Sequence, residues 1–201
     1  MASDRETESR GEARRAAVAA ATWEVIRQRG LSGASMREIA RQAGCTTGVL
    51  THYFRNKEEL LDYAFRLAVA RTWRRTLEAA DRAPTGEGLV PALLEALPRD
   101  EERRLEVSVY LSYLASASQE ARRAAQYLEH LGAWRELVAR LVTEACALEG
   151  HDPPDDPERV AALLLAAVDG LSVRALAEPE RFDAGRQEAV LRALVDRALS
   201  P

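Results

Sequence analysis

Helix-breaking residues divide this chain into segments that all carry helical periodicity, and this division constrains the fold more than any other feature. The breaks fall at 30–33, 44, 55–56, 84–88, 98–99, 150–157 and 178–179. Between them apolar residues recur every three or four positions, and we find no alternating β-branched run and no Asn-Gly hairpin turn. We therefore expect an all-α protein.

The segments predict about nine helices, and several begin at a recognisable cap. We expect them over roughly 11–29, 35–42, 46–54, 56–82, 88–97, 101–117, 119–149, 156–177 and 183–199. Ser35 and Glu38 form an S-x-x-E capping box, and Thr46 and Asp156 are good N-caps. Gly44 permits a tight turn through positive φ. The first ten or so residues are expected to be disordered.

The charge distribution separates the beginning of the chain from the rest. The net charge is -4, yet residues 1–60 carry 10 basic against 8 acidic side chains, and the remainder carries 18 against 24. A slightly basic start on an acidic body suggests an anionic partner for the first part only.

Cysteine usage and hydropathy favour the reducing cytoplasm. Cys45 and Cys146 lie far apart and form no CxxC pair, so we expect neither a disulfide scaffold nor a zinc site. The opening MASDRETESRGEARR is charged and has no apolar core, unlike a signal peptide. The longest apolar run, 160–168, is too short to cross a bilayer, so no membrane partner is expected.

The short helices expected over 35–42 and 46–54, joined by Gly44, have the spacing of a helix-turn-helix. The second helix of such a pair fits the major groove of DNA. Its inner face can be held by Val49, Leu50 and Phe54. Its outer face offers Thr46, Thr47, Gly48 and Thr51, and Tyr53 and Lys57 suit phosphates. Any pair of short helices around a glycine shares this spacing, so a purely structural helix pair remains the alternative.

The stretch ASMREIARQAGCTTGVLTHYFRNKEELL resembles the N-terminal module of the Tet repressor family of bacterial regulators. The resemblance covers about residues 14–62, and VDGL at 168–171 with GVLTHYF is similar to the betaine-regulator branch. It implies an all-helical homodimer with a DNA-binding domain over 1–57 and an effector-binding and dimerisation domain over 58–201. The implied function is a repressor that binds a palindromic DNA operator and is released by a small molecule.

The resemblance also assigns roles to residues of the helix-turn-helix. Arg37 matches a position that reaches a base or phosphate, Thr47, Gly48 and Thr51 match base-reading positions, and Tyr53 and Lys57 match phosphate clamps. Many family members have an aromatic residue where Thr51 stands, and Thr51 can offer DNA either a hydroxyl or a methyl group. His52 can reach a phosphate, or it faces solvent or packs on the first helix. Tyr53 can instead brace the first helix.

An effector site is expected among aromatic and polar residues of otherwise apolar helices. The candidates are Trp73, Tyr110, Tyr113, Trp134 and Asp169, each of which also suits a core or surface position. Aromatic faces with an acid would favour a cationic ligand.

The last two helices are expected to form the dimer interface. One apolar stripe contains Leu163, Leu164, Ala167, Val168 and Leu171, and the other contains Val190, Leu191, Leu194, Val195 and Ala198. Two copies of each would build a four-helix bundle. The alternative is that both stripes pack inside one subunit.

Metal and enzyme functions find little support in the sequence. His151, Asp152, Asp155 and Asp156 resemble a metal cluster, but the intervening prolines favour a solvated loop and a helix cap, so we predict no metal and no cofactor. No G-x-S-x-G, P-loop, G-x-G-x-x-G or H-E-x-x-H motif occurs, which argues against an enzyme. The remaining alternative is a helical small-molecule-binding protein without specific DNA binding.

Overall fold

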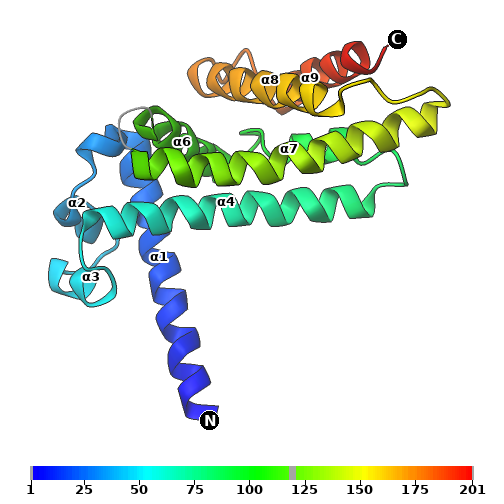
Figure 1. Cartoon of the computed structure of the whole chain (residues 1–201). Coiled ribbons are helices and arrows are strands. Elements are labelled where there is room, and N and C mark those ends of the chain that lie inside the picture. The colour runs from blue at the N-terminus through cyan, green and yellow to red at the C-terminus, as the bar shows by residue number, and fades with distance from the viewer. Residues whose placement is uncertain (1, 118–120, 201) are drawn as a thin grey trace. The chain divides into compact units, whose positions relative to one another are not determined.

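The computed structural model of the chain describes residues 2–117 and 121–200, and every regular element within these ranges is an α-helix. In chain order (Figure 1) they are α1 Ala2–Gly33, α2 Met36–Gln42, α3 Thr47–Tyr53, α4 Lys57–Arg82, α5 Leu89–Leu94, α6 Glu101–Ala117, α7 Ala121–Glu149, α8 Pro157–Ala177 and α9 Ala184–Leu199. The predicted all-α class is confirmed, and most predicted bounds lie within two residues of the observed ones. Residues 119 and 120 of the predicted seventh helix lie outside the described ranges.

Helix α1 departs most from the prediction. It begins at Ala2 and not near Gly11, so residues 2–9, which were expected to be disordered, are helical. This stretch contains no proline, and its first glycine is Gly11, so nothing in its backbone interrupts a helix. The predicted break at Gly30 is present as a kink, because the φ of Gly30 is 69° and therefore left-handed. Helix α1 continues past this kink and ends at Gly33.

Packing groups the described residues into two compact units. Unit 1 contains the residues up to Ala70 together with Ser108–Tyr113, and unit 2 contains Arg71–Val107 and the residues from Leu114 onward. Helices α4 and α6 therefore each contribute residues to both units. The predicted division into domains 1–57 and 58–201 stays a prediction, and packing places the first half of α4 in unit 1.

The core of unit 1 is built from one apolar stripe on each of its helices. Its side chains include Val18, Trp23, Ile26, Ile39, Leu50, Phe54, Leu61 and Phe65, each at most 2% exposed. The indole Nε1–H of Trp23 also donates to the carbonyl oxygen of Ala64 at 2.9 Å and so ties α1 to α4. Because these stripes face inward, the opposite faces of α2 and α3 are left to solvent.

The core of unit 2 is centred on α8, which packs against α7 on one side and α9 on the other, while α5 contacts both α7 and α9. Figure 1 shows α8 and α9 side by side. Leu93, Leu141, Val142, Leu164 and Leu191 fill this core and are each at most 3% exposed. Buried Gln187 fastens the start of α9, because its Nε2 donates to the carbonyl oxygens of Phe182 at 2.8 Å and Pro98 at 3.4 Å.

Helix α8 is long and apolar enough to cross a membrane by length and composition, the one such helix in the described part of the chain. The apolar run 160–168 underestimated the length of the apolar segment, because the helix continues through Asp169 to Ala177. An apolar core helix of a soluble protein meets the same criteria. Val160, Leu164 and Val168 of α8 belong to the core of unit 2, but only 39% of its most apolar window is buried. The other face of α8 is therefore both apolar and exposed.

Candidate functional site

Helix α2 begins at the side-chain cap that the sequence predicted. The backbone N–H of Glu38 donates to Ser35 Oγ at 3.2 Å and so satisfies one free N–H group of the helix start. The reciprocal half of the predicted capping box is replaced, because the Glu38 carboxylate lies 3.0 Å from Arg41 Nη2 and 3.4 Å from Arg29 Nη2. Charge-assisted bonds to guanidinium groups are stronger than a bond to a neutral N–H. The hydrogen bond from Arg41 lowers the pKa of Glu38.

The turn and helix α3 also form as predicted. Gly44 has a φ of 63°, which allows the chain to reverse between α2 and α3. Thr46 caps α3, because its Oγ1 accepts from the backbone N–H of Val49 at 3.4 Å. Leu50 and Phe54 are both 0% exposed and hold α3 from its inner side. This anchoring leaves the opposite face of α3 free to contact a partner.

The side chains proposed for DNA contact are available at the surface of unit 1. Arg37, Thr46, Thr47, Gly48, Thr51 and His52 are exposed, and Tyr53 and Lys57 are partly buried. Two of these hydroxyl groups already form hydrogen bonds within the protein. Thr46 Oγ1 caps the helix, and Thr51 Oγ1 donates to the carbonyl oxygen of Gly48 at 3.0 Å. Of the alternatives for His52, the structure shows an exposed ring, with an edge-to-face contact to Tyr53 at 5.0 Å between centroids.

Two cations lie at the start of α4. Lys57 Nζ donates to the carbonyl oxygen of Ser32 at 3.5 Å, and an ammonium has further donors for other acceptors. Arg55 is paired with Glu59, which accepts from its backbone N–H at 2.9 Å and from its Nε at 3.1 Å. The bond from the Arg55 backbone lowers the pKa of Glu59. Because the Arg55 side chain is 89% exposed, a phosphate can replace Glu59 as its partner at little cost.

Arg15 braces the C-terminal end of α3, and sequence reasoning did not identify this role. Its guanidinium lies over the rings of Phe54 and Tyr63, 5.1 and 4.8 Å from their centroids. The Tyr63 hydroxyl donates to Glu12 at 2.7 Å, and burial together with this bond raises the pKa of Tyr63 to about 12. These residues lie about 40 to 50 positions apart, so no helical spacing in the sequence links them.

Two of the predicted effector residues meet in unit 2. The rings of Trp73 on α4 and Trp134 on α7 lie edge to face at 5.7 Å, and His130 lies 6.0 Å from Trp134. Burial lowers the pKa of His130 to about 4, so its imidazole is neutral at neutral pH. The indole Nε1 of Trp134 and the hydroxyl of Thr76 are buried without a hydrogen-bond partner. Neither His130 nor Thr76 was identified from the sequence.

The other predicted effector residues are placed differently. Tyr113 is 0% exposed and belongs to the core of unit 1, where its ring stacks on Phe65 at 3.9 Å and its hydroxyl donates to Asp62 at 3.1 Å. Its hydroxyl therefore already bonds to the protein itself, and its role as a ligand contact stays a prediction. Tyr110 on α6 belongs to unit 1 and Asp169 on α8 to unit 2, and both are partly buried.

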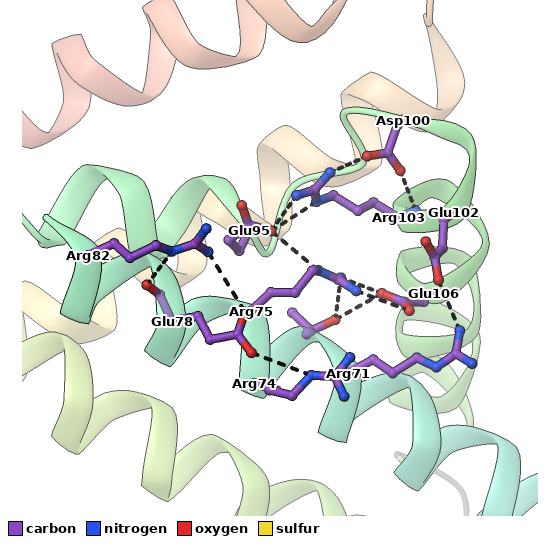
Figure 2. Close-up of polar contacts among 11 residues, drawn as sticks. Arg71, Arg74, Arg75, Glu78, Arg82, Glu95, Asp100, Glu102, Arg103 and Glu106 are labelled. Carbon is purple, nitrogen blue, oxygen red and sulfur yellow. Dashed lines mark hydrogen bonds and ion pairs between the residues drawn. The ribbon is translucent and has the colours of Figure 1, made fainter.

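Charged side chains form a network at the junction of α4, α5 and α6 in unit 2 (Figure 2). We define this ion network as Arg75, Glu95, Asp100, Arg103 and Glu106. Arg75 Nη2 lies 2.5 Å from Glu106 Oε2, and Arg75 Nε lies 3.3 Å from Glu95. Arg103 pairs with both Glu95 and Asp100. Burial opposes the charge of Arg75, but hydrogen bonds to Glu106 outweigh this effect and raise the pKa of Arg75.

The predicted dimer stripes lie mostly inside the subunit. Leu164, Val168, Leu171, Leu191 and Val195 are between 0% and 6% exposed and belong to the core of unit 2. Leu163 and Leu194 of the same stripes are exposed, at 63% and 37%. The buried members of the stripes pack against α7 and between α8 and α9, because the same helical periodicity also serves packing within the subunit. The interface stays a prediction for the exposed Leu163 and Leu194. The exposed face of α8 instead carries Ala162, Leu163, Ala166, Gly170 and Val173.

The acidic loop before α8 is a capping structure. Asp156 Oδ1 accepts from the backbone N–H of Arg159 at 2.9 Å, with Pro157 at the first helical position, as predicted. His151 Nε2 lies 2.9 Å from Glu149. Within residues 2–117 and 121–200, no three His, Cys, Asp or Glu side chains come together in a way that could hold a metal ion.

The chain matches two family descriptions that together span most of its length. Residues 18–64 match bacterial regulatory proteins of the tetR family, and residues 85–200 match the C-terminal part of BetI-type transcriptional repressors. The chain is 34% identical over 183 residues to the HTH-type transcriptional regulator PksA of Bacillus subtilis. The aligned region covers 90% of this chain and 87% of PksA.

Solved structures show the same fold. A transcriptional regulator from a Rhodococcus species superimposes with a TM-score of 0.80 at 29% identity, covering 92% of this chain and 95% of that one. A regulator from Saccharomonospora viridis, crystallised in complex with choline, superimposes with a TM-score of 0.81 over 92% of this chain and 96% of that one. At 22% identity the second likeness concerns the fold alone.

Proposed function

Because this chain belongs to the TetR family of bacterial regulatory proteins, we propose that it is a ligand-responsive repressor that binds a palindromic DNA operator as a homodimer in the cytoplasm. The observation that carries this proposal is helix α3. Its inner side is fixed by fully buried Leu50 and Phe54, while its outer side presents exposed polar groups and no apolar residue that needs a protein partner. A rigid helix of this kind fits the major groove.

The residues of the helix-turn-helix divide into two proposed roles. Thr47, Gly48 and Thr51 face the base edges, where small side chains allow close approach. Phosphates are contacted by Arg37, Thr46, His52, Tyr53 and Lys57 around the ends of α2, α3 and α4, which sets the register of the protein on the duplex. The available donors of Lys57 and the exposed ring of His52 support this division.

Fluorescence anisotropy on the DNA upstream of the gene, at low and moderate salt, tests DNA binding. Thr47→Ala should weaken selective binding, because it removes a base contact. Lys57→Ala should weaken binding to every sequence and reduce the salt dependence, because one fewer counterion is released. Arg74→Ala is the control: it removes a charge that is 71% exposed on α4 outside the proposed interface. Fragments selected from the genome supply the operator if it lies elsewhere, and equal binding to all of them would favour a ligand-binding protein without specific DNA binding.

The effector is proposed to bind in unit 2 beside Trp73 and Trp134, with Asp169 of the same unit as a further candidate contact. Buried polar groups without partners are rare in proteins, and a bound molecule would satisfy the indole N–H of Trp134 and the hydroxyl of Thr76. The match to BetI-type repressors and the choline bound to the Saccharomonospora regulator support a small organic effector.

Release of DNA on titration with choline, and with a panel of small metabolites, tests the effector site. Trp134→Phe removes the N–H but keeps the aromatic surface, so it should raise the concentration of the active compound that is needed for release. Trp23→Phe is the matched control in unit 1, where the indole N–H already bonds to Ala64. Equal responses of both variants would contradict the assignment.

The homodimer is proposed to form through the exposed apolar face of α8, defined by Ala162, Leu163, Ala166, Gly170 and Val173, together with Leu194 of α9. Leu163 is 63% and Val173 is 51% exposed, and an apolar face of this length usually marks an interface. A two-fold axis would pair the face with itself. Light scattering should report a dimer that Leu163→Glu disrupts. Leu128→Glu is the control, because Leu128 is also 63% exposed but lies on α7.

A further inference from the structure

Thr51 and Gly48 form a small feature on the outer face of α3 whose chemistry differs from that of the rest of the face. Residues three apart in a helix are neighbours on its surface, so the two positions lie side by side. The Thr51 hydroxyl donates its only proton to the carbonyl oxygen of Gly48 at 3.0 Å. A threonine hydroxyl that bonds back to its own helix leaves the methyl group of the same side chain as its outward group. Thr51 is exposed, so this methyl group faces whatever α3 contacts.

Gly48 is not required by the fold. Its backbone is helical with no left-handed φ. A Cβ added there would meet Thr46 Oγ1 at 3.6 Å, which is an ordinary contact, and nothing closer. Alanine is the better helix former, so the protein itself gains nothing from glycine at this position. The missing side chain leaves the surface at Gly48 open, with Thr51 as its neighbour three residues along the helix.

We propose that Gly48 and Thr51 form an apolar notch that accepts the C5-methyl group of a thymine in the operator. This inference rests on the proposed DNA-binding function and deepens it. In the major groove only thymine presents a methyl group, so apolar contact distinguishes it from the other bases. To donate to a base acceptor, the Thr51 hydroxyl would first have to release the Gly48 carbonyl. Among the described contacts, the Thr47 hydroxyl of the same face has no such bond. The Thr47 hydroxyl is therefore the one that contacts polar groups on the base edges.

The test compares two substitutions that separate the methyl group from the hydroxyl. Thr51→Val keeps the branched shape and the methyl group and loses the hydroxyl, while Thr51→Ser keeps the hydroxyl and loses the methyl group. Both occupy an exposed helical position, and thermal unfolding by circular dichroism checks that both fold. Each protein is titrated by anisotropy against the selected operator and against copies in which single thymines are replaced by deoxyuridine, which lacks only the C5-methyl group.

We expect one thymine per half-site to respond. Its replacement by deoxyuridine should weaken binding of the wild-type protein and of Thr51→Val about fourfold per half-site, the equivalent of burying one methyl group. Thr51→Ser should lose the same factor on the natural operator and show no further loss on that deoxyuridine copy, which is the non-additivity that direct contact requires. Gly48→Ala should also lose discrimination, because its Cβ fills the notch without disturbing the fold.

Several outcomes would overturn the notch. If Thr51→Ser binds as tightly as the wild-type protein while Thr51→Val loses affinity, the hydroxyl and not the methyl group is the reading group. If every deoxyuridine copy weakens Thr51→Ser as much as it weakens the wild-type protein, thymine methyl groups are read elsewhere. If the wild-type protein binds no sequence selectively, both the proposed function and the notch are wrong. If it binds selectively and no deoxyuridine replacement changes its affinity, only the notch is wrong.

Discussion

Charged side chains in the two units are arranged in opposite ways. Around the candidate DNA-binding face of unit 1 the pairs are local and exposed: Glu38 with Arg41 three residues on, and Arg55 with Glu59 four residues on. In unit 2 the ion network of Figure 2 joins residues 31 positions apart, and the side chain of Glu106 is 1% exposed. Exposed local pairs contribute little to stability, while a buried pair is costly to break. The first arrangement leaves charges free to exchange partners, and the second holds α4, α5 and α6 together.

The largest effect should follow from breaking the ion network at Glu106. Glu106→Ala would leave the partly buried guanidinium of Arg75 without its main partner and Thr72 without its acceptor. We expect the free energy of unfolding to fall by about 3 kcal/mol, the lower end of the cost of an uncompensated buried charge, because Arg75 keeps some solvent access and its contact with Glu95. Urea unfolding followed by circular dichroism measures this change.

Glu102→Ala is the matched control on the same helix. Glu102 also pairs with an arginine of α4, Arg71 at 3.0 Å, but its side chain is 64% exposed. Its removal should cost less than about 1 kcal/mol. Equal losses for the two variants would show that burial does not distinguish the network from the surface pairs.

The contrast between local and distant contacts also explains what the sequence could predict. The caps at Ser35, Thr46 and Asp156, and the left-handed glycines 30 and 44, depend on residues within four positions, and all of them are present. The Arg75–Glu106 pair of the ion network and the stacking of Arg15 on Phe54 join residues 31 and 39 positions apart. Nothing in a helical repeat specifies which charged residue of one helix meets which residue of another, so these contacts could not be predicted.

Periodicity misled the interface prediction for a related reason. A stripe such as Leu164, Val168 and Leu171 shows only that one face of α8 is apolar, and that face packs within the subunit. Leu163, which the sequence placed in the same stripe, is exposed on the opposite side of α8 together with alanines and Gly170. The sequence was equally ambiguous for Tyr113, because a buried tyrosine with a bonded hydroxyl and a ligand-binding tyrosine look alike in a sequence.

The next largest effect concerns a group that is buried in its neutral form. Burial lowers the pKa of His130 to about 4 from its ordinary value of 6.5. The unfolded chain therefore binds the additional proton between these values, so stability is full above about pH 6.5 and falls as the pH drops toward 4. Allowing for partial solvent access, we expect a loss of about 2 kcal/mol across this window. His130→Gln, which carries no proton to gain, should have a flatter stability profile than the wild-type protein between pH 6.5 and 4.

A smaller effect is expected from the tyrosine that sequence reasoning placed in the effector site. Tyr113→Phe deletes the bond to Asp62, which is itself 3% exposed. Loss of a buried bond to a carboxyl group should lower the free energy of unfolding by about 1–2 kcal/mol while ligand affinity is unchanged. Tyr63→Phe is the control, because its hydroxyl bonds to Glu12 at the surface. A large change in effector affinity for Tyr113→Phe would return Tyr113 to the binding site.

The smallest effect should come from the cap of α2. At the start of this helix a neutral cap and exposed ion pairs occur together, so their contributions to stability can be compared. Ser35→Ala removes the acceptor for the backbone N–H of Glu38 and should cost about 1 kcal/mol, while the pairs of Glu38 with Arg41 and Arg29 remain. Ser32→Ala is the control, because the contact recorded at Ser32 uses its backbone oxygen. Since α2 supports α3, Ser35→Ala should also weaken DNA binding modestly. If Ser35→Ala left the free energy of unfolding unchanged, the exposed ion pairs of Glu38, and not the cap, would fix the start of α2. Local charges in unit 1 would then contribute more to stability than their exposure suggests.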